Sequence, residues 1–144
     1  MTKRLVIACL FLLSVAGLKA QTYCYHCYKS CVETKSGYKY SLENYYTTFT
    51  FKGDCLYTDN TYPLSGASRS NRLWKMSSIE NGGMLIYSEY EKNIFGKWKQ
   101  IDYTNFDHFY EVSGNRNTIT YIKSSNTSPF EAYYFERCPD RNCR

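Results

Sequence analysis

The sequence lacks the short motifs that mark the common catalytic and cofactor-binding sites. Its 144 residues contain no His-Glu-x-x-His zinc motif, no Gly-x-Ser-x-Gly nucleophile turn and no glycine-rich phosphate loop. Only 2 histidines are present, His26 and His108, and no motif links them. We therefore predict that the protein binds neither a metal ion nor a cofactor.

Long apolar runs are also absent, except at the N-terminus. A short basic start leads into an apolar run from Leu5 to Leu18, and Ala20 supplies a small residue at a cleavage point. A membrane-spanning helix needs about 20 apolar residues, so this run is too short to be an anchor. We interpret residues 1–20 as a secretory signal peptide. Residues 21–144 would form the mature protein, secreted or periplasmic, with no membrane insertion after the signal is removed.

The tetrapeptide that ends at Cys9 offers an alternative, because Val6-Ile-Ala-Cys9 is similar to the lipobox of lipoproteins. The apolar region of a signal normally spans roughly 7–15 residues. Only the four residues from Leu5 to Ala8 precede Cys9, and the apolar run continues beyond it. The pattern therefore favours cleavage after Ala20 over lipidation at Cys9.

The mature chain lacks a strong charge of either sign. Without residues 1–20 it carries 15 Lys and Arg against 13 Asp and Glu, which gives a net charge of +2. Proteins that bind nucleic acids or anionic lipids usually present a concentrated basic surface. We therefore predict no nucleic-acid partner.

Removal of the signal leaves an even number of cysteines. The chain has 7, and the mature protein keeps six of them: Cys24, Cys27, Cys31, Cys55, Cys138 and Cys143. An even count in a short exported protein is typical of a disulfide framework. We predict that all six form disulfides, and the pairing among them is left open.

The first three cysteines have the spacing of one helical face. Steps of three and four residues place Cys24, Cys27 and Cys31 on one stripe of a helix, and Gly37 would end that helix. Cys24 and Cys31 would then lie about 10.5 Å apart, whereas a disulfide needs Cα atoms within ~7 Å. At least one of them must bond a distant cysteine, so we expect a short N-terminal helix tied to the sheet and to the C-terminal tail.

The same cysteines allow two other interpretations. Cys24-Tyr-His-Cys27 has the spacing of a redox pair, but the strand and helix that flank such pairs are not expected here. Zinc could be held by Cys24, Cys27 and Cys31 together with His26 or Cys55, although His26 would point away from the cysteine stripe. An oxidising compartment favours disulfides over both.

Aromatic residues are dense, and the chain alternates in polarity after residue 44. The sequence contains 16 Tyr, 8 Phe and 2 Trp, which favour half-buried strands. Turn signals rich in Gly, Asn and Ser separate short alternating segments. We predict strands at residues 45–52, 55–57, 72–77, 84–91, 97–103, 106–112, 118–123 and 130–137.

Short connections between these segments imply antiparallel neighbours. The predicted fold is therefore a single, mainly β domain. Its sheet is an antiparallel meander of about eight strands, open or barrel-like, with the short N-terminal helix tied on by disulfides.

The C-terminal half contains three Tyr- and Phe-rich segments: residues 106–112, Asn117-Thr-Ile-Thr-Tyr-Ile122 and Phe130-Glu-Ala-Tyr-Tyr-Phe-Glu-Arg137. In these segments the chain resembles small Tyr-rich exported proteins of gut-type Gram-negative bacteria, and the Ala20-Gln21 junction is similar to their cleavage sites. The resemblance implies export and a β meander but no activity. The cysteine content departs from that group, whose members are usually poor in cysteine.

The surplus of aromatic residues suggests a contact surface. A domain of this size cannot bury every ring, and tyrosine is well suited to contacts that are part polar and part apolar. We predict a monomeric, non-enzymatic binding or interaction module that recognises a protein or carbohydrate ligand. The candidate contact residues are Tyr57, Tyr62, Trp74, Tyr87, Tyr90 and Trp98.

Two alternative functions stay open. A small secreted hydrolase, nuclease-like, would use His108, and a Lys or Arg and a carboxylate beside His108 would favour it. A secreted inhibitor would act through the connection from Thr58 to Ser70, which is rich in Ser, Gly, Asn and Thr. Glu89 and Glu91 lie two residues apart, and we interpret them as part of a solvent-facing strand surface rather than as a glycosidase pair.

Overall fold

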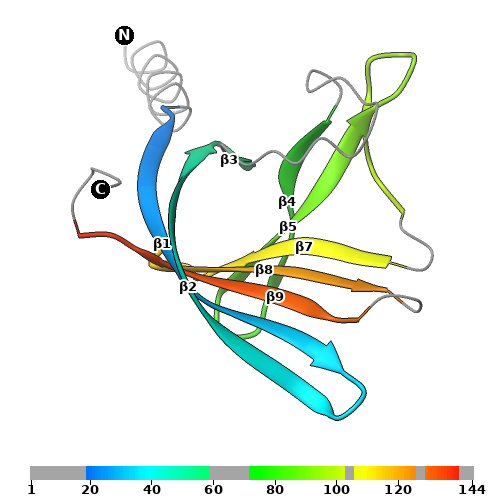
Figure 1. Ribbon diagram of the computed structural model, residues 1–144. Helices are drawn as coiled ribbons and strands as arrows, with labels where there is room; N and C mark the ends of the chain where they lie inside the picture. The colour runs from blue at the N-terminus through cyan, green and yellow to red at the C-terminus, as the bar shows by residue number, and fades with distance from the viewer. Residues whose placement is uncertain (1–18, 59–71, 103–105, 126–128, 140–144) are drawn as a thin grey trace, which may run out of the picture.

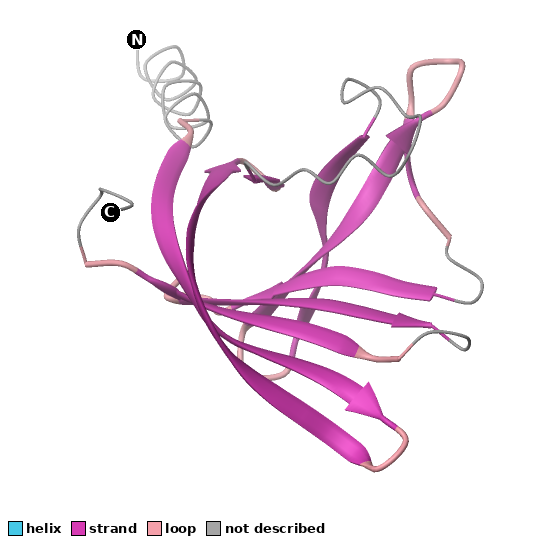
Figure 2. Cartoon of the chain, viewed as in Figure 1, coloured by secondary structure: helices cyan, strands magenta, loops and turns pink. Residues whose placement is uncertain are grey.

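The computed structural model describes residues 19–58, 72–102, 106–125 and 129–139, and these residues form one curved sheet (Figure 1). The sheet has nine strands: β1 (Gln21–Thr34), β2 (Gly37–Lys52), β3 (Cys55–Thr58), β4 (Arg72–Glu80), β5 (Met84–Lys92), β6 (Trp98–Gln100), β7 (Phe106–Val112), β8 (Thr118–Ser125) and β9 (Glu131–Arg137). Within those ranges, every element of regular secondary structure is a β-strand (Figure 2). The prediction of a mainly β, antiparallel protein is confirmed.

Eight of the strands close into a barrel. They pair antiparallel in the order β1-β2-β3-β4-β5-β7-β8-β9, and β9 pairs with β1 to complete the ring. The ninth strand, β6, pairs with Tyr90, Glu91 and Lys92 of β5, on the edge that β7 occupies at residues 85–88. Because successive strands are neighbours in the ring, the barrel is the closed form of the predicted meander.

The predicted N-terminal helix is wrong. Residues 24–34 belong to β1, which pairs with β2 on one side and with β9 on the other. The spacing of the cysteines fits a strand because β1 has an irregularity between Cys27 and Lys29, where it carries one residue more than β9. This irregularity changes which side chains face inward. Gly37 does not end a helix: it follows the turn between β1 and β2 with φ +121°, a conformation that favours glycine.

The inward face of the barrel changes from polar to apolar along its strands. Towards one end, the inward residues are Thr47, Thr58, Glu89, His108, Lys123 and Glu131, from strands β2, β3, β5, β7, β8 and β9. Two residues further along each of these strands, towards the other end, the inward residues are Phe49, Leu56, Tyr87, Tyr110, Tyr121 and Tyr133. We call these two ends of the interior the polar half and the apolar half.

The apolar half is a packed aromatic core. Its fully buried side chains include Tyr25, Phe49, Phe51, Leu56, Tyr87, Val112 and Ile119. Phe49 lies near the centre, with its ring centroid 5.2 Å from that of Tyr25, 5.6 Å from Tyr110 and 5.5 Å from Phe135, all in edge-to-face geometry. Edge-to-face packing is favourable for aromatic rings, so strands from opposite sides of the barrel are held together here.

Arg116 covers the apolar half from the turn between β7 and β8. Its guanidinium carbon lies 4.4 Å from the ring centroid of Phe51, and its Nη1 donates to Oε1 of Gln21 at 2.8 Å. The hydroxyl of Tyr25 donates to the backbone oxygen of Arg116 at 2.6 Å, and burial raises the pKa of that hydroxyl, which keeps it protonated. Arg116 adopts φ +59°, uncommon for a residue other than glycine, so these contacts fix an unfavourable backbone conformation.

The cysteines do not lie on one face. Cys27 faces the interior opposite Tyr45, whereas Cys24 and Cys31 face outward on the same strand. Cys27, Cys31 and Cys55 carry free thiols, and burial raises the pKa values of Cys27 and Cys55. Cys143 lies outside the described residues. The prediction that all six cysteines form disulfides is not supported, because Cys27, Cys31 and Cys55 carry free thiols.

No helix within the described ranges is long and apolar enough to cross a membrane.

Candidate functional site

Four strands bring polar side chains together in the polar half. Trp74 of β4 is the direct partner of Glu89 on β5, and His108 of β7 is the direct partner of Lys123 on β8. Glu89 and His108 are the residues that follow the last pair between β5 and β7, Ser88 with Phe109. Because directly opposite residues in antiparallel strands share a face, Trp74, Glu89, His108 and Lys123 form a row across the inner wall.

His108 is fixed by an aromatic surround. Its Nε2 is 2.9 Å from the hydroxyl oxygen of Tyr121, and the two ring centroids are 5.1 Å apart. The indole of Trp74 lies 4.8 Å from the imidazole, centroid to centroid. The imidazole is half-buried. A ring held on two sides in this way has little rotational freedom, so the row presents a defined surface.

The aromatic side chains continue along the wall from His108. Trp74 and Tyr110 meet edge to face at 4.7 Å, Tyr110 and Tyr121 lie 4.9 Å apart, and Tyr121 and Tyr133 lie 6.1 Å apart. This set spans the polar half and the adjoining tyrosines of the apolar half. We call it the polar–aromatic cluster: Trp74, Glu89, His108, Tyr110, Tyr121, Lys123 and Tyr133. It combines ring faces with an acid, a base and hydroxyl groups, which is the composition of many small-molecule sites.

Glu89 is not part of a solvent-facing surface, and that interpretation of the sequence is wrong. Glu89 is only 7 % exposed, whereas Glu91 is exposed to solvent. The two residues share the inward direction of β5, but Glu89 lies beside Tyr87 and opposite Trp74, inside the barrel. Glu91 lies near the end of the strand, where Arg72 and Lys99 are its neighbours on the adjacent strands.

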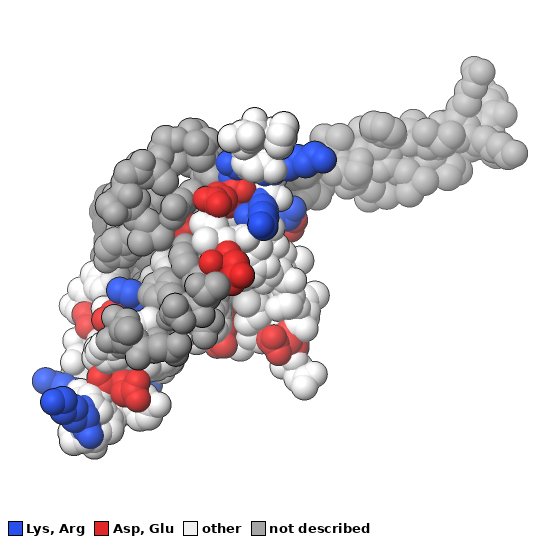
Figure 3. Space-filling view, turned by 90° about the vertical axis from the view of Figure 1, so that its right-hand side faces the viewer, with Lys and Arg blue, Asp and Glu red and all other residues white. Residues whose placement is uncertain are grey.

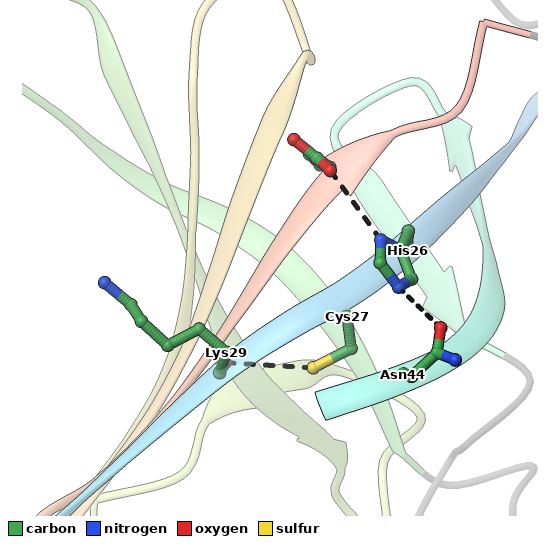
Figure 4. Close-up of polar contacts among 5 residues, drawn as sticks. His26, Cys27, Lys29 and Asn44 are labelled. Atoms are coloured by element: carbon green, nitrogen blue, oxygen red, sulfur yellow. Dashed lines mark hydrogen bonds and ion pairs between the residues drawn. The ribbon is translucent and has the colours of Figure 1, made fainter. Parts of the chain in front are cut away.

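The two histidines lie on opposite sides of the barrel wall. His26 is on the outer face of β1, where Nε2 is 3.0 Å from Oδ1 of Asn44 and Nδ1 is 3.6 Å from Oε1 of Glu136 (Figure 4). Its ring stacks on that of Tyr46 at 4.9 Å. Cys27, next in sequence, points to the other side. A site that uses both histidines is therefore not formed.

The predicted contact residues do not form one surface. Trp74 belongs to the polar–aromatic cluster, and Tyr87 is 1 % exposed in the core. Tyr57, Tyr90 and Trp98 face outward from β3, β5 and β6, with Lys75 Nζ 5.7 Å from the ring centroid of Tyr90 and Lys92 Nζ 5.8 Å from that of Trp98. Tyr62 lies outside the described residues, as does nearly all of the connection that follows Thr58.

The sequence did contain a signal for the missed partner of His108. The turn at residues 113–117 joins two alternating segments, and pairing outward from Val112 with Ile119 places His108 opposite Lys123. The position of Glu89 depends on the pairing of β5 with β4 and β7, and the segment between β5 and β7 does not fix that pairing locally.

Charge is mixed over the surface seen in Figure 3, where Lys and Arg lie close to Asp and Glu over the described residues. The same part of the chain contains no group of three His, Cys, Asp or Glu side chains placed to hold a metal ion. The polar–aromatic cluster brings an acid, a base and aromatic rings together on the inner wall, and it is the candidate site.

Comparison of the chain with protein-family models, curated proteins and solved structures gives no match.

Proposed function

We propose that this is an exported binding protein that takes up a small, ring-bearing polar ligand in the polar half of its barrel. The observation that carries the proposal is the row of Glu89, His108 and Lys123, which faces inward between aromatic rings. Export is inferred from the signal-like pattern of residues 1–20.

Charged side chains inside a barrel of this size need a reason. Eight strands enclose a space that side chains can fill or that can hold one small ligand. Transfer of Lys or Glu from water into such an interior costs free energy, and these residues are rarely fully buried unless they are paired. The apolar half supplies a complete aromatic core, so the charges at the other end are not needed for core packing.

The geometry favours a ligand that contains a ring. Trp74, Tyr110, Tyr121 and Tyr133 form a nearly continuous series of rings with centroid separations of 4.7 to 6.1 Å. Aromatic faces bind flat aromatic rings and the apolar faces of sugar rings. Lys123 can donate hydrogen bonds to such a ligand and Glu89 can accept them.

The experiment is a titration with two sets of probes, monosaccharides and aromatic carboxylic acids, followed by tryptophan fluorescence. The Trp98→Phe variant leaves Trp74 as the single indole, and Trp74 lies in the cluster. We expect at least one probe to change the emission of Trp74 with saturation. Lys123→Met in the same background should weaken the affinity for that probe by about tenfold or more, since it removes a charged hydrogen-bond donor.

The matched control is Lys97→Met, which removes the same charge from an exposed turn residue. It should leave the affinity unchanged. Absence of a saturable change with every probe, or equal losses for Lys97→Met and Lys123→Met, would contradict the proposal.

A hydrolase is the second candidate, because His108 lies between Lys123 and Glu89 in the row across the inner wall. General acid–base catalysis by such a histidine contributes about 100- to 10,000-fold to a rate. We favour binding because the Nε2 of His108 already contacts the Tyr121 hydroxyl.

The two candidates are separated by assaying bis(p-nitrophenyl) phosphate and a short RNA. The binding proposal predicts no turnover above that of the His108→Ala variant. Turnover that falls by a factor of about 100 or more in His108→Ala would establish the hydrolase instead.

A further inference from the structure

The β1–β2 hairpin extends beyond the part of the barrel where β2 is paired on both sides. β3 pairs with β2 only from Phe49 to Lys52. Among the described strands, none pairs with the same edge of β2 over residues 38–44, and the hairpin projects from the barrel wall (Figure 1). An open edge presents backbone N–H and C=O groups that can pair with another strand.

The outward face of this edge is apolar and exposed. Tyr38 is 61 % exposed, Tyr40 59 % and Leu42 93 %. The rings are nevertheless held in place: Tyr38 meets Phe130 edge to face at 6.0 Å, and Nζ of Lys29 lies 5.3 Å from the ring centroid of Tyr40. Exposed apolar groups on a rigid, unpaired edge are typical of an interface rather than of a solvated hairpin.

We infer that two copies of the chain join edge to edge through antiparallel pairing of residues 38–44, in place of the monomer that the sequence suggested. A two-fold axis at Ser41 places Lys39 of each copy opposite Glu43 of the other. It also places Tyr40 opposite Leu42, so apolar groups meet on the outward face.

The charges select this register. An axis at Tyr40 would place Lys39 opposite Ser41, and an axis at Leu42 would place Glu43 opposite Ser41. Only the axis at Ser41 gives two ion pairs, and a shift by one residue breaks both of them. Since one strand pair buries a small area, we expect a dissociation constant in the micromolar range, about 1–100 μM.

The first test is sedimentation velocity of the mature chain at increasing concentration. We expect a monomer–dimer equilibrium that Lys39→Glu weakens by about tenfold or more, because two attractive cross-strand pairs become repulsive. Lys39→Glu combined with Glu43→Lys should restore the dimer. Lys35→Glu, in the hairpin turn outside the paired stretch, is the matched control and should have little effect.

The second test does not depend on charge. Opposite residues in antiparallel strands have Cβ atoms about 4.5–5.5 Å apart, so Ser41→Cys should form a disulfide between copies under mild oxidation. Ser36→Cys is the control, because ten residues separate its two copies along the paired strands, roughly 33 Å. A monomer at all concentrations, a dimer insensitive to Lys39→Glu, or equal cross-linking of the two cysteine variants would overturn the inference.

Discussion

The same strands build both halves of the barrel interior, but the two halves differ in composition and in what they are expected to contribute to stability. In the apolar half, rings pack edge to face around Phe49, and Arg116 covers the end. In the polar half, His108 and Lys123 face inward and are half-buried, and Glu89 is buried. We therefore expect the apolar half to carry most of the stability of the fold, which leaves the polar half free to hold polar groups.

The largest effect is expected in the apolar half. Phe49→Ala should lower the free energy of unfolding by about 3–5 kcal/mol, because it removes a fully buried ring and leaves a cavity between three others. Chemical denaturation followed by circular dichroism measures the loss. Ile94→Ala is the control, at a residue 94 % exposed, and should change stability by less than about 0.5 kcal/mol. A loss below about 1 kcal/mol for Phe49→Ala would break the assignment of stability to this half.

A smaller loss is expected where the apolar half is covered. Tyr25→Phe removes the hydroxyl that donates to the backbone oxygen of Arg116 and keeps the ring. We expect the free energy of unfolding to fall by about 1 kcal/mol, the usual net contribution of one hydrogen bond. Amide exchange at residues 113–117 should accelerate as well. If the variant is as stable as the parent and its exchange is unchanged, Arg116 is not a structural cover.

The polar half should tolerate substitution better. His108→Gln keeps a hydrogen-bonding group near the Tyr121 hydroxyl, and the site is not fully buried. We therefore expect a loss of less than about 1 kcal/mol in the free energy of unfolding. Any probe that gives a saturable change in Trp74 fluorescence should bind more weakly. If His108→Gln destabilised the protein as strongly as Phe49→Ala, the distinction between the two halves would fail.

The smallest effect concerns a carboxylate on the outside of the wall. Burial, and to a lesser extent the charge of Glu80, raise the pKa of Glu111 on the outward face of β7. The folded state therefore holds this proton more tightly than the unfolded chain, so the charged form destabilises the fold at neutral pH. Stability should be regained as the pH falls through the raised pKa.

Glu111→Gln should accordingly increase the free energy of unfolding at pH 7, by less than about 0.5 kcal/mol. The gain over the parent should shrink as the pH falls towards the ordinary range of glutamate. Urea denaturation at several pH values measures it. A gain that is constant with pH would show that the charge of Glu111 is not its cause.

Much of the fold could be predicted from local patterns. The eight strands predicted after residue 44 all appear, because alternation and turn residues act over short distances. The strand β1 and the first part of β2 were missed. β1 and β2 pair with each other across a short turn, but β1 also pairs with β9, more than a hundred residues away in sequence. The cysteine spacing fits a helical face, and it fits a strand only through the irregularity between Cys27 and Lys29, which the local sequence does not indicate.

The candidate site could be predicted only in part. Trp74 was selected for its ring, and His108 was kept as the centre of an alternative enzyme, but neither was expected beside the other. Their 4.8 Å contact requires β4 and β7 to flank β5 in the closed ring, which the local sequence does not specify. The inward direction of Glu89 follows from the same closure.

The most direct test of the binding proposal compares the two indoles of the protein. The N–H resonances of Trp74 and Trp98 report on the polar half and on the outer strand β6, and both can be followed by two-dimensional NMR of the ¹⁵N-labelled mature chain during titration with monosaccharides and aromatic carboxylic acids. A bound probe should move the Trp74 indole resonance and leave that of Trp98 in place. The binding proposal is contradicted if no probe moves the Trp74 resonance, or if every probe that binds moves only the Trp98 resonance.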